Sequence, residues 1–230
     1  MTIAESAKSI EEHLRQLRKE FHRHPEISGN EKKTAARIVR ELSEIGGFEI
    51  REGVGGHGVI AELSGALPGP VIALRADMDA LQIEEETGLS FCSENCGVMH
   101  ACGHDGIVAS ALVLARILAE EGEDFPVRMR FLFEPAEEIG EGAKRMLVAG
   151  ALDGEPDIFL MFHYAVDQSF GMAVHEGQAS AMINGMEIRV HGKSSHWCEA
   201  HKGIDSIYAA SLVVKAFMIL MKRIKEKVPA

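Results

Sequence analysis

Residues 105–133, DGIVASALVLARILAEEGEDFPVRMRFLF, contain the pattern that decides the fold. The segment Asp105–Glu120 is rich in Ala, Val and Leu and predicts a buried helix. The following run, Val127–Phe133, predicts a strand that ends before Pro135. Alternating helices and strands, with several strands continuously apolar, indicate an α/β fold with a largely parallel central sheet flanked by helices.

The same alternation continues toward both ends of the chain. Apolar residues at helical spacing from Ile10 to Phe21 predict an opening amphipathic helix. Ser28 and Glu31 predict a capping box for a second helix, which should stop at Gly46. Further strands are predicted at residues 48–51, 58–63, 71–76 and 157–163, and a short helix at 143–149.

The tail of the chain has a different pattern. Residues 182–191, MINGMEIRVH, alternate like a half-exposed strand, and a long apolar helix is predicted from about Gly203 to Lys225. A single strand and helix cannot bury so large an apolar face. We therefore expect residues 1–180 to form the N-terminal part of one domain and residues 181–230 to begin a second, incomplete one. Either the chain is a fragment or another molecule covers this surface.

The overall composition argues against several classes of protein. The 230 residues carry a formal net charge of −11, which argues against nucleic acid and against an anionic membrane surface as partners. The start lacks the basic and apolar segments of a signal peptide, and the most apolar stretch, Ile207–Met221, is too short to span a bilayer. The four cysteines have no C-x-x-C spacing, so we expect free thiols and a cytoplasmic location.

Residues 100–105, HACGHD, place a thiol and an imidazole two positions apart around a glycine. Cys102 and His104 can therefore point at one centre, and Asp105 follows at the predicted helix start. Cysteine, histidine and carboxylate side chains are the ligands of zinc and related divalent metals. On its own, the pattern also fits a buried cysteine beside a helix-capping segment.

Carboxylates follow two of the predicted strands. Glu137 and Glu138 lie in EPAEE, residues 134–138, and Asp77 and Asp79 lie in RADMD, residues 75–79. Ligands collect at the carboxyl ends of strands in α/β sheets. One glutamate can bind a metal while the other acts as a general base, and the aspartates can orient a histidine ligand. The alternatives are an exposed acidic loop and a capping or turn role.

Two further histidines are candidates. An isolated histidine such as His163, at the end of an apolar strand, is more often a core residue. Nevertheless, the candidate residues all lie at the ends of predicted strands or in adjoining loops, which should bring them together: Asp77/Asp79, Cys102/His104, Glu137/Glu138 and His163. Their convergence favours a metal site. Considered alone, His196 in GKSSH would be interpreted as a histidine in a surface loop.

Longer stretches strengthen this interpretation. They are FHRHPEIS, GVGGHGVIAELSG, VIALRADMDALQI, VMHACGHDG, FEPAEE, and VHGKSSH followed by GIDSI. With them the chain resembles the zinc-peptidase-like metal-dependent amidohydrolases, which include aminoacylases, hippurate hydrolases, auxin-conjugate hydrolases and N-acetyldiaminopimelate deacetylases. The resemblance implies a catalytic domain followed by the first strand and helix of an inserted α+β lid domain.

The resemblance also implies a role for each motif residue. Two divalent ions are expected, zinc or manganese, with cobalt or nickel as alternatives. The expected ligands are Cys102, His104, Glu138 and His163, with Cys102 bridging the ions. The expected catalytic residues are Glu137 as general base, Asp79 as a supporting carboxylate, and His196 from the lid, which would steady the substrate carbonyl oxygen.

The chain also departs from the family pattern. Ile107 replaces a usual histidine, Glu134 stands where glutamine is common, and Trp197 and Cys198 replace small residues after the lid histidine. Members of the family continue well past residue 230, complete the lid and supply a last metal-binding histidine.

We therefore expect a homodimeric enzyme that hydrolyses N-acyl amino acids, or a related small amide or dipeptide, with the dimer formed through the lid. The alternative is a truncated or split fragment that needs the missing C-terminal part for catalysis. A zinc-stabilised structural domain is a third possibility. Structural zinc sites have four paired Cys/His ligands, whereas the candidate ligands here are mixed with carboxylates.

Overall fold

The computed structural model describes residues 3–65, 67–122, 126–164, 171 and 186–225. By its internal contacts the chain divides into two units, Met1–Ser169 and Phe170–Ala230. The predicted domain boundary at residues 180 and 181 lies outside the described residues. The assignment of the two parts as catalytic domain and lid stays a prediction.

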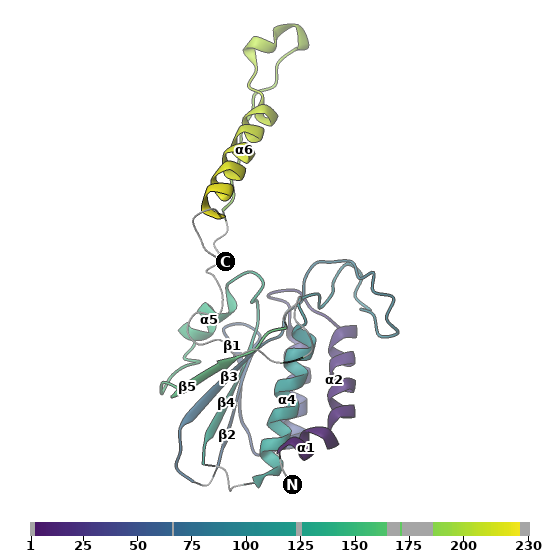
Figure 1. Cartoon of the computed structure of the whole chain (residues 1–230), viewed down its shortest axis with the longest axis vertical. Coiled ribbons are helices and arrows are strands. Elements are labelled where there is room, and N and C mark those ends of the chain that lie inside the picture. Colours follow the sequence, from purple (N-terminus) through teal and green to yellow (C-terminus); the bar gives the residue numbers. More distant parts are fainter. Residues whose placement is uncertain (1–2, 66, 123–125, 165–170, 172–185, 226–230) are drawn as a thin grey trace. The chain divides into compact units, whose positions relative to one another are not determined.

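The first unit is built around a five-stranded sheet with the strand order β1-β2-β4-β3-β5 (Figure 1). β3 pairs in parallel with β4 and β5, whereas β2 runs antiparallel to β1 and β4. The strands are β1 (Glu49–Val54), β2 (Gly58–Ser64), β3 (Val71–Asp77), β4 (Arg128–Glu134) and β5 (Ile158–Met161). The predicted α/β class is confirmed, and the β1–β2 hairpin adds an antiparallel edge to the parallel half of the sheet.

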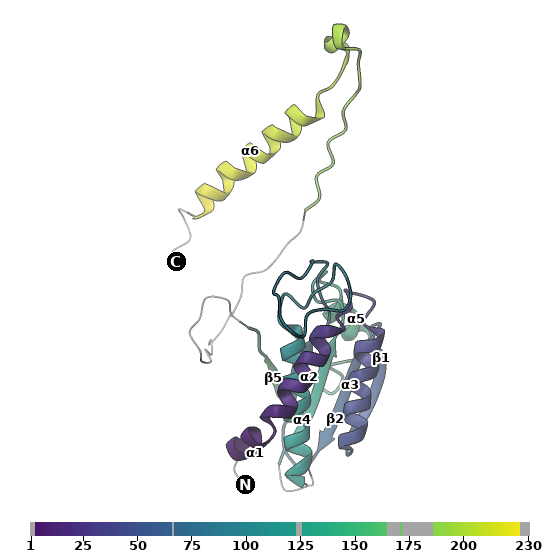
Figure 2. The ribbon, with the colours of Figure 1, turned by 90° about the vertical axis from the view of Figure 1, so that its right-hand side faces the viewer.

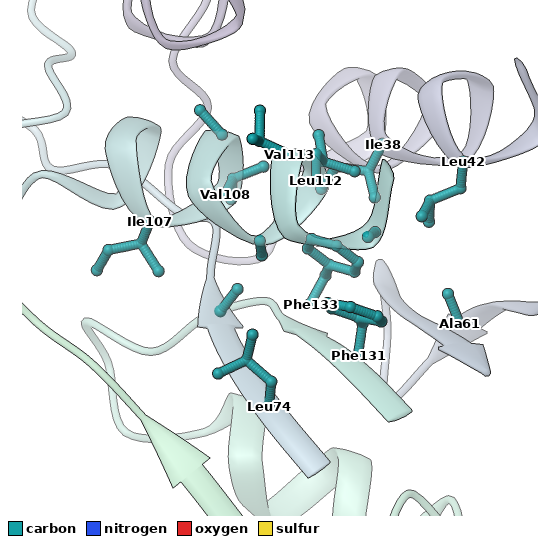
Figure 3. Packing of buried hydrophobic residues seen from close by; sticks show 14 of the residues in the cluster. Ile38, Leu42, Ala61, Leu74, Ile107, Val108, Leu112, Val113, Phe131 and Phe133 are labelled. Carbon is teal, nitrogen blue, oxygen red and sulfur yellow. The ribbon is translucent and has the colours of Figure 1, made fainter. Parts of the chain in front are cut away.

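Helices cover one face of this sheet (Figures 1 and 2). They are α1 (Ile3–Ser9), α2 (Glu11–Arg23), α3 (Lys32–Ile45) and α4 (His104–Glu120). Figure 3 shows Leu112 of α4 close to Ile38 of α3 and to Phe131 and Phe133 of β4, all in one buried cluster. Fully burying side chains of this size stabilises a fold by about 1.5–3 kcal/mol each. This packing fixes α4, and with it the residues at the N-terminus of α4.

The opposite face of the sheet has a smaller core. Helix α5 (Gly142–Val148) inserts Met146 into a cluster with residues of all the strands except β5. β5 itself forms an edge of the sheet, and its four apolar side chains are between 45% and 59% exposed. Because successive side chains of a strand point to opposite faces, β5 is partly exposed to solvent on both of its faces.

The start of α3 differs from the predicted capping box. The Ser28 hydroxyl donates to Oδ2 of Asp79 at 2.6 Å, and Oε1 of Glu31 accepts from the backbone N–H of Ala136 at 2.8 Å. The predicted box is therefore wrong, because distant parts of the chain occupy both of its side chains.

Glu26 supplies the cap of α3 instead. Its Oε2 accepts from the backbone N–H groups of Lys33 and Thr34, both at 2.8 Å. These are first-turn donors that have no partner within the helix. The helix ends at Gly46, as predicted, with a φ of 83°.

The second unit contains a 3-10 helix, Trp197–Lys202, and helix α6, Ser206–Lys225. The predicted long helix is thus confirmed. The predicted strand at 182–191 is not formed over residues 186–191, and residues 182–185 lie outside the described ones. A strand needs a neighbour for its backbone hydrogen bonds. In the described part of this unit, the bridge pairing joins Lys193 and Ile204.

Apolar side chains of α6 remain exposed, including Ile207 (82%), Val214 (62%) and Met218 (67%). Among the described residues, no helix has both the length and the apolar character required to cross a membrane.

Candidate metal centre

Charged side chains meet at the carboxyl ends of β3 and β4. Parallel pairing sets Asp77 beside Glu134. The guanidinium of Arg75 donates to Glu134, and its Nη1 lies 3.1 Å from Oδ2 of Asp77. Its Nη2 lies 3.7 Å from Oε1 of Glu137. Because Arg75 is largely buried, little water screens these charges, and the arginine orients all three carboxylates.

The turn that follows β4 carries Glu137 and Glu138 and contains a strained residue. Ala136 has a φ of 53°, a conformation that costs a non-glycine residue about 1–3 kcal/mol. The N–H of Ala136 is bound by Glu31, and the N–H of Glu138 donates to Oδ2 of Asp79 at 3.0 Å. Buried carboxylates from other parts of the chain thus hold both ends of the turn.

Cys102 and His104 flank Gly103, which has a φ of 82° and precedes α4. The His104 ring is fully buried, and its Nδ1 lies 2.9 Å from the backbone carbonyl oxygen of Asp79. A carbonyl oxygen only accepts, so Nδ1 carries a proton and Nε2 is the nitrogen that faces the carboxylates of the centre. This is the usual way in which a metal-binding histidine is oriented.

His163 follows β5 and reaches the same place. Its Nε2 lies 3.4 Å from Sγ of Cys102, and its ring centre lies 5.9 Å from that of His104. Its Nδ1 donates to the carbonyl oxygen of Tyr164 at 2.9 Å. As with His104, the other nitrogen is left to face the centre.

Several buried side-chain nitrogen and oxygen atoms at this centre have no hydrogen-bond partner among the described residues. They are Nε2 of His104, Oε1 of Glu138, Oδ1 of Asp79 and both carboxylate oxygens of Asp77. Arg75 forms an ion pair with Asp77 without hydrogen-bond geometry. An unsatisfied buried polar group costs roughly 1–3 kcal/mol, so the convergence of several indicates a ligand.

The types and spacing of these atoms fit a divalent metal. Nε2 of His104 lies 3.6 Å from Asp77, 3.7 Å from Glu138 and 3.9 Å from Glu137. Two sets of potential ligand atoms, each within 4.8 Å of one another, are Cys102–His104–His163 and Asp77–His104–Glu137. Sulfur, imidazole nitrogen and carboxylate oxygen together are the donors of zinc and related transition metals.

The pKa values reflect the negative charge gathered here. Burial lowers the pKa of His104, but the Asp79 carboxylate, whose Oδ1 lies 3.4 Å from Nδ1, and the charges of Asp77 and its neighbours outweigh burial and raise the pKa to about 9. Burial and the adjoining glutamates raise the pKa of the Cys102 thiol to about 12. Burial and the charge of Asp77 also raise the pKa of Glu137. The same field favours a bound cation.

Six of the seven candidate residues therefore lie around one centre: Asp79, Cys102, His104, Glu137, Glu138 and His163. Their individual roles stay predictions. His196 belongs to the second unit, where its Nδ1 lies 2.9 Å from Sγ of Cys198. Its role toward a substrate also stays a prediction.

Two residues of this site were not assigned to it from the sequence. Arg75 lies inside a strand predicted to be buried, and a buried arginine requires acidic partners. This requirement could have indicated Asp77 and Glu134 as its partners. Glu31 matched a local capping pattern. Only the fold places it against Ala136.

The sequence of the chain is similar to those of known proteins. Residues 73–216 match the sequence model of Peptidase family M20/M25/M40. The N-acetyl-L-cysteine deacetylase of Bacillus subtilis is 38% identical over 94% of this chain and 51% of its own length. The N-acyl-L-amino acid amidohydrolase of Geobacillus stearothermophilus is 38% identical over 90% of this chain and 56% of its own length.

A solved structure is similar as well. A Bacillus subtilis protein described as a dinuclear metal-binding peptidase of the M20 family is 42% identical, with a TM-score of 0.66 over 70% of this chain and 44% of that chain. The chain thus spans about half the length of the curated relatives it matches. The resemblance drawn from the motifs is confirmed: the chain belongs to peptidase family M20/M25/M40.

Proposed function

We propose that the chain provides the metal-binding part of an enzyme that hydrolyses the amide bond of N-acyl amino acids, or of a related small amide or dipeptide. The observation that carries the proposal is the convergence of Cys102, His104 and His163 with unpartnered buried carboxylates. Relatives named as a deacetylase and an amidohydrolase support this class of substrate.

Four side chains would hold two divalent ions, zinc or manganese, with cobalt or nickel as alternatives: Cys102, His104, Glu138 and His163. Ions bound there would supply the positive charge that makes a water molecule acidic enough to lose its proton near neutral pH. The thiol of Cys102, whose Sγ lies within 4.8 Å of ring nitrogens of both histidines, is the candidate for a shared ligand.

The remaining chemistry belongs to side chains of the protein. Glu137 takes the proton of the attacking water and delivers it to the leaving amine nitrogen. The backbone carbonyl of Asp79 keeps the His104 ring in the orientation that presents Nε2 to the centre. His196 would steady the substrate carbonyl oxygen as negative charge develops on it. The products are a carboxylic acid and a free amino acid.

The test is amine release from N-acetyl and N-benzoyl amino acids by the purified chain with Mn²⁺ or Zn²⁺. In Glu137→Gln, which keeps the shape of the side chain, turnover should fall about 10²–10⁴-fold while Mn²⁺ binding by calorimetry is retained. Unchanged turnover in this variant removes Glu137 from the role of base.

A second candidate is that the chain is inactive until a complementary polypeptide joins it. The exposed apolar side chains of β5 and α6 favour this alternative, because large uncovered apolar surfaces mark interaction sites. Robust turnover by the isolated chain would defeat it.

We also propose a cytoplasmic homodimer, formed through residues 181–230, for the complete protein. Support comes from the family resemblance and from free cysteines among the described residues. The net charge of −11 speaks against a nucleic-acid partner. Light scattering on the complete protein and on one that lacks residues 181–230 tests the dimer.

A further inference from the structure

We propose that Glu31 is a positioning residue for Glu137 and Glu138, and that it acts through the backbone N–H of Ala136. The roles of the two glutamates rest on the proposed function, whereas the contact between Glu31 and the turn rests on the fold alone. Glu31 lies outside every motif segment that contains a proposed ligand or base.

The environment of Glu31 is unusual for a carboxylate. The residue is 0% exposed, and its Oε1 accepts from two backbone N–H groups, those of Gly29 at 2.7 Å and Ala136 at 2.8 Å. Its Oε2 has no hydrogen-bond partner among the described residues. Burying a charged group in this way is unfavourable unless its hydrogen bonds compensate. Because Glu26 already caps α3, the helix start does not require the side chain of Glu31.

Glu31 binds the backbone of Ala136, the strained residue of the turn. Ala136 is 1% exposed with a φ of 53°, and such residues persist only where their surroundings enforce them. Relaxation to the right-handed region would rotate the backbone by about 110°. That rotation would redirect Glu137 and Glu138 away from His104. A charged acceptor binds an N–H about twice as strongly as a neutral one. A carboxylate is therefore well suited to hold the strained backbone of Ala136.

Neighbouring residues hold the same turn from other sides. Ser28 donates to Asp79, and Asp79 accepts the N–H of Glu138. A Cβ added to Gly142 would lie 1.6 Å from the carbonyl oxygen of Pro135, so the chain that leaves the turn packs directly against it. The short segment from Ser28 to Glu31 thereby fixes both ends of the turn that presents the two glutamates.

The first experiment measures amide hydrogen exchange in residues 134–141 of the full chain. Glu31→Leu should make exchange in this turn at least about tenfold faster, which corresponds to one lost hydrogen bond to a charged group. The matched control is Glu41→Gln. Glu41 lies on α3 and, like Glu31, is a buried carboxylate, but its partners are His13, Arg37 and Arg116. Equal acceleration of the turn in both variants would overturn the proposal.

Glu31→Gln covers the case in which Glu31→Leu does not fold. Its amide oxygen occupies the place of Oε1 but accepts about half as strongly. Exchange in the turn should therefore rise by about threefold, with protection in α4 unchanged. Exchange equal to that of the unaltered chain would contradict the assignment.

The second experiment separates positioning from general destabilisation. Glycine adopts a φ of 53° without strain, so Ala136→Gly should reduce the need for Glu31. Glu31→Leu should weaken Co²⁺ binding, followed by its visible absorption, by about tenfold. Adding Ala136→Gly should restore at least about threefold. Failure of the second substitution to restore any affinity would overturn the proposal.

Turnover provides a further readout where the chain hydrolyses a substrate. A misplaced base should lower kcat about 100-fold with KM nearly unchanged. If the unaltered chain neither binds Co²⁺ nor hydrolyses N-acyl amino acids, the proposed function fails, and the amide exchange of the turn still decides the role of Glu31.

Discussion

The backbone carbonyl of Asp79 accepts a hydrogen bond of 2.9 Å from Nδ1 of His104. The carboxylate of the same aspartate binds Ser28 and the N–H of Glu138. Asp79 therefore links β3, α4 and the turn after β4 at one point. A residue that orients two proposed ligands at once should affect metal binding without being a ligand.

Asp79→Ala should weaken Co²⁺ binding by about 10–100-fold, the usual effect of losing a partner that orients a ligand. The carbonyl that holds His104 remains, so the loss falls on Glu138 and its turn. Asp157→Ala is the control, because Oδ2 of Asp157 accepts the N–H of Val71 at the other end of β3. Equal losses of affinity in the two variants would argue against a local role for Asp79.

Gly103 separates two proposed ligands and should not tolerate a side chain. Its φ is 82°, and a Cβ there would lie 2.8 Å from the ring of Tyr164. Gly103→Ala should reduce the free energy of unfolding by about 1–2 kcal/mol through backbone strain and should also weaken Co²⁺ binding. Gly122→Ala has similar strain, with a φ of 74°, but open space around the Cβ. Loss of metal binding in Gly122→Ala as well would mean that strain alone is responsible.

The sequence was sufficient to predict most of the described helices and strands and the convergence of the candidate site residues. Helix α4 was predicted because its residues are apolar on all sides, and the clustering of Cys102, Glu138 and His163 was predicted because parallel strands end at one edge. These inferences use local composition and a general rule of α/β topology.

The hydrogen bonds by which Ser28 and Glu31 support the site were not predicted. The S-x-x-E pattern of Ser28 and Glu31 satisfies a local rule, but the fold offers Glu31 a partner 105 positions away. Such a choice depends on tertiary packing that no short pattern contains. The strand predicted at 182–191 is not formed over its described residues, 186–191, for a related reason, since a strand is formed only with a neighbour.

Glu41 should make stability depend on pH in the acid range. Burial raises its pKa, but hydrogen bonds from Arg116, Arg37 and His13 outweigh burial and lower the pKa from 4.5 to about 2. A folded-state pKa below the unfolded one gives stability that is present above pH 4.5 and lost as the pH falls toward 2. Glu41→Gln should cost about 3 kcal/mol at pH 7.

Urea unfolding at several pH values tests this prediction. The difference between the unaltered chain and Glu41→Gln should shrink below pH 4.5, because the carboxylate is then protonated in the unfolded state. A difference that stays constant as the pH falls toward the folded pKa of about 2 would show that Glu41 acts through packing rather than through charge.

His22 should have the opposite dependence on pH. Its Nδ1 lies 2.9 Å from Asp105 and its Nε2 3.2 Å from Glu85. The hydrogen bond to Asp105 raises the pKa of His22, and the contact with Glu85 adds to this effect. Together they outweigh burial, which lowers the pKa. Arg18 also approaches Asp105, at 3.3 Å. The imidazolium thus ties α2 to the start of α4 and to the segment that contains Glu85.

A raised folded-state pKa means that this stabilisation is complete below the unfolded pKa of 6.5 and is lost as the pH rises through the folded value. Amide exchange of residues 84–95, corrected for its intrinsic pH dependence, should therefore become faster above pH 6.5. His22→Gln should exchange quickly at every pH, since a neutral amide pairs weakly with both carboxylates. If the pH dependence survived in His22→Gln, another group would have to control the segment, and the anchor would not be His22.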